Sequence, residues 1–300
     1  MRRKLIGVIV VTAGVLALAG CAKPAGVDGK LFNGWALPPE PKIPVPTAPA
    51  CYEVKTEDPT EVPKWPAAID CASPHTVETL HVGQFEGADA DRSSPPPSGG
   101  PERRKAYEQC NVKATESLGA DWRTGRIELF LVLPIELHWD AGARWFRCDV
   151  VEYRDLEDFA VVDRNGSMKG ALAGTGDLKL GCATVSAAGD TIDKVLPITC
   201  TTAHNGEFTG IFDHPDGEYP TDGAARSKAN LDGCRGIVAG YTGIPNDKDF
   251  QYRVGQVASP FSKASWELGN RGVRCYVWTP KNVATTLKGA GPGGLPINYA

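Results

Sequence analysis

The sequence lacks the short motifs that mark the commonest catalytic and nucleotide-binding sites. It contains no C-x2-C pair, no G-x-x-x-x-G-K-[ST] loop and no G-x-S-x-G segment. The first absence argues against a cysteine-rich zinc site, and the second argues against a P-loop for nucleotide phosphates. The third argues against the nucleophile turn of the α/β-hydrolases. We therefore expect no metal and no cofactor, and we assign no catalytic residue.

Positive charge and long apolar runs are also scarce. Lys and Arg number 32 against 36 Asp and Glu, which gives a formal net charge of −4, and no stripe rich in Lys and Arg stands out. Nucleic acid is therefore not expected as a partner. The apolar stretch "IELFLVLPIEL" (127–137) is too short to span a membrane, and Pro134 and Glu136 interrupt it.

The N-terminus predicts the cellular location. Arg2, Arg3 and Lys4 precede an apolar run over residues 5–20, which ends in Leu-Ala-Gly before Cys21. This pattern resembles a bacterial lipobox. It predicts that residues 1–20 are a lipoprotein signal peptide and that Cys21 carries a diacylglycerol thioether. We expect a protein anchored by its N-terminal lipid in the outer face of the cytoplasmic membrane.

The residues after the lipidated cysteine predict a tether. Residues 21–50 are rich in Pro, Ala and Gly, and the Pro-rich part should be extended enough to hold a folded body off the membrane. Removing residues 1–20 takes away three positive charges, so the remaining chain has a formal net charge of −7.

The other eight cysteines predict disulfides and a duplication. In a chain exported to an oxidising space, an even number of cysteines indicates a disulfide framework. The eight fall into two sets, with successive steps of 20, 39 and 38 residues in the first and 18, 34 and 41 in the second. The sets are Cys51, Cys71, Cys110 and Cys148, and Cys182, Cys200, Cys234 and Cys275.

Residues around these cysteines repeat at matching positions. A histidine follows each second cysteine by four residues, and a glutamate follows three residues later. A Trp-x2-Gly-x-Arg-x2-Arg-Cys segment contains each fourth cysteine. The matching pairs are His75 and His204, Glu78 and Glu207, Trp139 and Trp266, and Arg144 and Arg271. We therefore expect two related domains, at 51–155 and 177–280, with a linker at 156–176 and a flexible tail at 281–300.

The lipobox, the Cys-x3-His-x2-Glu segment, the helix with the third cysteine and the closing Trp-x2-Gly-x-Arg-x2-Arg-Cys segment together resemble a known family. It is the septum-formation family of actinobacterial envelope proteins. The resemblance covers both domains. It implies an association with the envelope and with division, but no defined chemistry. One departure is that Pro74 precedes His75, whereas Ala203 precedes His204.

The pattern in each copy predicts strand, strand, helix, strand, strand. This order favours an α+β fold: two tandem small disulfide-bonded domains, each a short sheet with one packed helix. In the first copy the expected strands are 51–54, 75–85, 126–137 and 144–153, around a helix at 103–119. In the second they are 178–185, 204–212, 249–259 and 271–279, around a helix at 224–240.

The histidine segment has a structural and a functional interpretation. Its residue types suit a metal site or a thiolate-imidazole-carboxylate site, but only with a free thiol. In an oxidising space Cys71 should be disulfide-bonded. On a regular strand, His75 and Glu78 would also point to opposite faces. We therefore favour a structural role, while His75, Glu78, His204 and Glu207 remain candidate ligand-binding residues.

The Trp-Gly-Arg segment also has two interpretations. Trp139 with Arg144, and Trp266 with Arg271, could recognise a sugar, a peptide or a carboxylate. The structural alternative is a tryptophan that covers the edge of the core beside a glycine turn.

Two classes of function stay open at this point. The first is a non-enzymatic binding or scaffold module that meets a cell-wall component or an envelope protein. The second is an extracytoplasmic hydrolase of a wall polymer, with Glu78, Glu207, Asp140 or His75 as the acid or base. We favour the first.

Four cysteines in each domain allow three disulfide connectivities. We favour first-to-second and third-to-fourth pairing. The first bond would join two neighbouring strands, and the second would attach the helix to the last strand. The main rival is first-to-fourth with second-to-third.

Overall fold

The computed structural model describes residues 43–54, 67–188 and 191–299. The expected signal peptide, Cys21 and the tether up to residue 42 lie outside these ranges. Within them, no helix has both the length and the apolar character that a membrane span requires. Residues Ile43–Ala300 form one compact unit.

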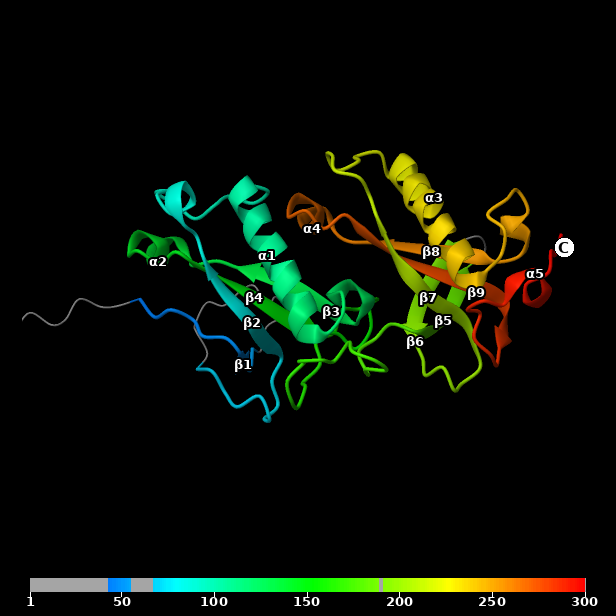
Figure 1. Ribbon diagram of the computed structural model, residues 1–300, viewed down its shortest axis with the longest axis horizontal. Helices are drawn as coiled ribbons and strands as arrows, with labels where there is room; N and C mark the ends of the chain where they lie inside the picture. Colours follow the sequence, from blue (N-terminus) through cyan, green and yellow to red (C-terminus); the bar gives the residue numbers. More distant parts are fainter. Residues whose placement is uncertain (1–42, 55–66, 189–190, 300) are drawn as a thin grey trace, which may run out of the picture. The chain divides into compact units, whose positions relative to one another are not determined.

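The first copy is a four-stranded antiparallel sheet with one long helix on one face (Figure 1). The strand order is β1-β2-β4-β3. The elements are β1 (Ala50–Tyr52), β2 (Val77–Gln84), α1 (Pro101–Leu118), β3 (Ile127–Val132) and β4 (Trp145–Glu152). This is the expected order of strands around a helix, and the α+β fold class is confirmed.

The second copy repeats this plan with an additional strand. Its sheet is antiparallel in the order β6-β5-β7-β9-β8. The elements are β5 (Cys182–Ala188), β6 (Thr191–Pro197), β7 (His204–Asp213), α3 (Gly223–Thr242), β8 (Gly255–Pro260) and β9 (Gly272–Val283). The sequence does not predict β6, because its residues are mostly exposed and lack a clean alternation.

Short helices complete both copies. They are η2 (Gly87–Asp89), η3 (Trp122–Thr124), α2 (Glu136–Asp140), η4 (Phe250–Tyr252), α4 (Lys263–Glu267) and α5 (Gly291–Gly294). The strand expected over 126–137 ends at Val132, and α2 begins at Glu136. Pro134 explains the difference, because proline cannot donate a hydrogen bond to a continuing strand ladder.

Helix α1 packs as its four-residue periodicity predicts. Ala106, Cys110, Ala114 and Leu118 are all buried on the face that meets the sheet. The helix ends at Leu118, and the following Gly119 has a φ of 86°, in the left-handed region that closes many helices.

Four disulfides join the pairs favoured from the sequence. Cys51–Cys71 and Cys182–Cys200 link residues 20 and 18 apart, near the start of each copy. The other two bonds attach the long helices to the sheets. They are Cys110–Cys148, from α1 to β4, and Cys234–Cys275, from α3 to β9. The favoured connectivity is confirmed, and the rival pairing is wrong.

The expected linker and tail are not loose. In the first, Met168 and Leu172 are fully buried in the core of the first copy. In the second, Leu287 and Leu295 are buried in the core of the second copy. A flexible tail at 281–300 is therefore a wrong expectation. Both segments are rich in glycine, but their few apolar side chains are spaced so that they pack into the core of each copy.

These two returning segments are themselves a repeat. The sequence "SMKGA" (167–171) corresponds to "TLKGA" (286–290). The amide of Gly170 donates to Ser117 O near the end of α1, and the amide of Gly289 donates to Tyr241 O near the end of α3. We call residues 167–172 and 286–291 the closing segments of the first and second copies.

Candidate functional site

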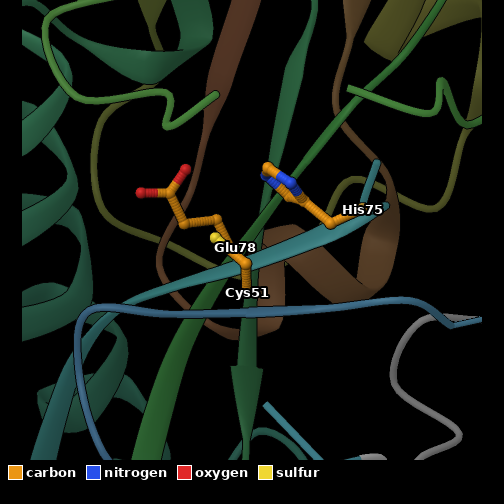
Figure 2. A group of neighbouring side chains, drawn as sticks. All are labelled: Cys51, His75 and Glu78. Carbon is orange, nitrogen blue, oxygen red and sulfur yellow. The ribbon is translucent and has the colours of Figure 1, made fainter. Parts of the chain in front are cut away.

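The Cys-His-Glu constellation exists, but with a different cysteine from the one expected. Figure 2 shows Cys51 of β1, His75 just before β2, and Glu78 of β2. One potential ligand atom from each residue lies within 4.8 Å of the other two. All three residues are buried, and His75 is fully so. The sulfur beside the histidine therefore belongs to Cys51 and not to Cys71.

The second copy contains the same cluster, made by Cys182, His204 and Glu207. Here the expectation that histidine and glutamate face opposite sides of the strand is wrong. His204 Nε2 lies 2.8 Å from Glu207 Oε1. The register of β7 against β9 shifts between His204 and Gly206, and such a bulge breaks the strict alternation of side chains.

Neither cluster offers a free thiol. Cys51 is bonded to Cys71, and Cys182 is bonded to Cys200. A disulfide sulfur is neither a nucleophile nor a good metal ligand, because both roles need the thiolate. In this oxidised form the residues present do not fit a cysteine-ligated metal ion.

The hydrogen bonds of the two histidines define their proton arrangement. His75 Nδ1 donates to Ser73 O at 2.8 Å, and His204 Nδ1 donates to Thr202 O at 2.9 Å. Nε2 of His204 then faces the Glu207 carboxylate, and the contact of 2.8 Å between them is a hydrogen bond.

The first copy differs at this point. His75 Nε2 is buried and has no hydrogen-bond partner among the described residues. Both oxygens of Glu78 are occupied by the closing segment instead. Ser167 Oγ donates to Oε1, and the amide of Met168 donates to Oε2, each at 2.6 Å.

In the second copy, the closing segment and helix α3 together saturate Glu207. Thr286 Oγ1 donates to Oε2 at 3.0 Å, and the amide of Leu287 donates to Oε1 at 2.8 Å. The Tyr241 hydroxyl of α3 adds a bond of 2.7 Å to Oε2. Burial alone would raise the pKa of Glu207, but the bonds from His204, Tyr241 and the closing segment outweigh it and lower that pKa.

The Trp139 and Arg144 pair attaches the polar loop of the first copy. Trp139 is fully buried, and its Nε1 donates to Arg92 O at 2.9 Å. The Arg144 guanidinium lies 4.2 Å from the centre of the Trp139 ring. It also donates to Ala90 O and to Trp139 O. The loop after β2 is thus held by both residues.

The corresponding pair in the second copy repeats this arrangement with fewer bonds. Trp266 Nε1 donates to Gly217 O at 3.0 Å. The Arg271 guanidinium lies 5.4 Å from the centre of the Trp266 ring and forms an ion pair with Asp216. In both copies the polar groups of the tryptophan and the arginine bond to the loop that precedes the long helix.

The closing segments, which supply the principal partners of both glutamates, were not predicted from the sequence. Their signal was present, since "SMKGA" and "TLKGA" are similar and each follows a fourth cysteine. Their glycine-rich surroundings were interpreted as linker and tail. Tyr241 was also missed, because its counterpart in the first copy is Ser117 and no repeat marks it.

A family model described as "Septum formation" matches residues 48–275. The matched range contains all eight disulfide-bonded cysteines and both Cys-His-Glu clusters. No curated protein and no solved structure matches the chain.

Proposed function

Because the chain belongs to the septum-formation family, we propose that it is a lipid-anchored, non-enzymatic binding or scaffold module of the cell envelope that acts in septum formation. Its four disulfides support an oxidising, extracytoplasmic compartment. The membrane is its first partner, through the lipid expected on Cys21. A cell-wall component or an envelope protein is its second.

The observation that supports a non-enzymatic role is the closure of both clusters. Each buried glutamate is bonded to the closing segment of its own copy. Each neighbouring sulfur is in a disulfide. A catalytic acid, base or nucleophile must reach a substrate atom within hydrogen-bond distance. The two glutamate carboxylates and the two sulfurs are instead already bonded to groups inside the fold.

The hydrolase alternative gains little support from its candidate residues. A retaining glycosidase needs two carboxyl groups about 5 Å apart at a cleft. Glu78 and Glu207 are each 1% exposed, and His75 is fully buried. Asp140 is exposed at the end of the short helix α2. We therefore do not propose hydrolysis of a wall polymer as the function.

The anchor is tested by Cys21→Ala. We expect this variant to be released to the medium or to stay uncleaved, because no thiol remains for the lipid. Lys23→Ala is the matched control and should stay in the membrane fraction. A Cys21→Ala protein that is still processed and fully membrane-bound would contradict the anchor.

The role in division is tested in living cells. A strain without the gene should place fewer septa per unit of cell length, and the wild-type chain should restore them. A fluorescent fusion at native abundance should concentrate at the septum. Unchanged septa together with an even distribution over the envelope would refute the link to septum formation.

A further inference from the structure

Two buried arginines at matching positions have different partners. Arg147 of β4 and Arg274 of β9 each precede the fourth cysteine of their copy, and they are 2% and 4% exposed. Arg147 forms an ion pair of 2.6 Å with Asp149. The residue that corresponds to Asp149 in the second copy is Tyr276. The carboxylate that neutralises the first arginine is therefore absent beside the second.

Arg274 is held in place by backbone carbonyls and an aromatic ring, and not by an ion pair. Its Nε donates to Arg123 O at 2.9 Å, and its Nη2 reaches Ile127 O at 3.4 Å. The guanidinium lies 4.2 Å from the centre of the Phe261 ring. No carboxylate of the described residues forms an ion pair with it. Its acidic neighbour in the cleft is Glu128, which acts on it through charge but forms no ion pair with it. A ligand carboxylate would therefore add a direct counter-ion to a buried charge.

Arg274 lies at a cleft of about 460 Å³, a size typical of ligand sites. We call it the β3–β8 cleft, because residues of both strands line it. Its walls are largely apolar and include Phe130, Leu131 and Phe261, with Phe159 half exposed. Glu128 is the one carboxylate among the described residues that line it.

One wall of the cleft is the free edge of a sheet. Strand β3 is the last strand of its sheet and pairs on one side only, with β4. The Tyr153 amide donates to Arg126 O, so alternate residues from 126 onward bond toward β4. The backbone groups of Leu129 and Leu131 therefore point away from β4. Among the described residues, no backbone hydrogen bond reaches them from outside the sheet.

The opposite wall cannot offer the same pairing. The Phe261 amide donates to Gly272 O, which directs the backbone of residues 261, 259 and 257 toward β9. The next outward-facing residue is Pro260, which has no N–H. Proline is a common block on exposed edge strands. An extended chain in the cleft would therefore pair with β3.

We propose that the β3–β8 cleft binds the C-terminal end of an extended peptide, with its terminal carboxylate on Arg274 and its main chain paired to the outer edge of β3. The position of Arg274 sets the direction of the peptide. Arg274 lies at the Ile127 end, where β3 begins. A peptide antiparallel to β3 ends at this point, which brings its carboxylate to the guanidinium.

Glu128 makes this binding depend on pH. Burial raises the pKa of Glu128 to about 7, an effect that Arg274 partly offsets. The other charged or titratable groups in the cleft are Arg103, Tyr107 and Tyr153. Tyr107 stays neutral because burial raises its pKa further. Above pH 7 the ionised Glu128 repels a ligand carboxylate, and below pH 7 this repulsion is lost.

Peptides with one altered group test the proposal on purified full-length protein. The probe is a fluorescein-labelled set of pentapeptides with random last three residues and a free C-terminal carboxylate. We expect binding that weakens about tenfold with C-terminal amides, because a charged hydrogen bond is lost. Methylation of the amides that face β3 should weaken it similarly. Failure of the free acids to bind, or equal binding of the acid and amide sets, would overturn the proposal.

Protein variants localise the binding without changing the peptide. Glu128→Gln should remove the difference in affinity between pH 6 and pH 8 and bind tighter than wild type at pH 8. Arg104→Gln, an exposed arginine outside this cleft, is the matched control and should bind like wild type. A pH dependence unchanged by Glu128→Gln would place binding elsewhere. The peptide site goes beyond the function proposed above. Because its test uses purified protein and no cells, peptide binding and the role in septum formation can each fail independently of the other.

Discussion

Ser167 Oγ donates a hydrogen bond of 2.6 Å to Glu78 Oε1, although the two residues are 89 positions apart. This bond connects a segment expected to be a linker to a glutamate expected to be a candidate site. The next residue, Met168, bonds the other oxygen through its amide. Glu78 is therefore the anchor that holds the closing segment on the first copy.

Replacing Glu78 by glutamine should destabilise the first copy strongly. The new amide NH2 would face either the Ser167 hydroxyl or the Met168 amide, and one buried donor would lose its acceptor. We expect a loss of about 2–3 kcal/mol in the free energy of unfolding, measured in urea. Glu116→Gln on the exposed face of α1 is the control and should change stability by less than about 0.5 kcal/mol. Equal effects of both substitutions would contradict this role of Glu78.

Tyr241→Phe should weaken the dependence of the free energy of unfolding on pH. Because the pKa of Glu207 is lowered in the fold, its stabilisation is present above the unfolded pKa and is lost as pH falls through the folded pKa. Removing the Tyr241 hydroxyl raises that folded pKa. The variant should therefore be less stable than wild type near pH 7, and the difference should disappear at low pH. A difference that stays constant from pH 7 to pH 2 would point to packing alone.

Glu128→Gln should change the pH dependence of the free energy of unfolding in the opposite sense. A carboxyl whose pKa is raised by burial from 4.5 to about 7 stabilises the fold fully below pH 4.5, and this contribution is lost as pH rises through 7. The shift corresponds to at most about 3 kcal/mol. The free energy of unfolding of the wild type should fall relative to that of Glu128→Gln between pH 5 and pH 8. Parallel profiles for the two proteins would show that Glu128 is not desolvated.

Leu287→Ala should show that the second closing segment is part of the core. Leu287 is 3% exposed, and removing its side chain should cost about 2–4 kcal/mol. The neighbouring Lys288 is exposed, so Lys288→Ala is the matched control. In limited proteolysis, the wild type should resist cleavage after residue 285 until the whole domain unfolds. Early trimming of this segment without loss of stability would contradict its packing.

The repeated cysteines carried most of what could be predicted about the fold. The helix expected at 103–119 contains Cys110 and the strand expected at 144–153 contains Cys148. These placements favoured the disulfide that the structure has. Such features are local and periodic, and they can be identified without knowing which segments meet.

The candidate site depended on contacts that no local pattern encodes. Neither the pairing of Glu78 with Ser167 nor the proximity of Arg274 to Glu128 follows from spacing within one copy. The lack of an aspartate beside Arg274 can be seen in the sequence, because "RCDVV" in the first copy corresponds to "RCYVW" in the second. Side chains do not alternate between the two faces of the strand at His204, because a bulge lies there. No residue type at this position predicts the bulge.

The position of the closing segments has a consequence for the ancestry of the chain. Since each copy ends with its own Ser/Thr-x-Lys-Gly-Ala segment, the duplicated unit extends past the fourth cysteine and contains everything needed to cover its buried glutamate. A single-copy ancestor would have been a complete domain before the duplication. The two copies differ at the residue after the fourth cysteine, where Asp149 of the first corresponds to Tyr276 of the second. Single-copy relatives should contain a closing segment after their fourth cysteine.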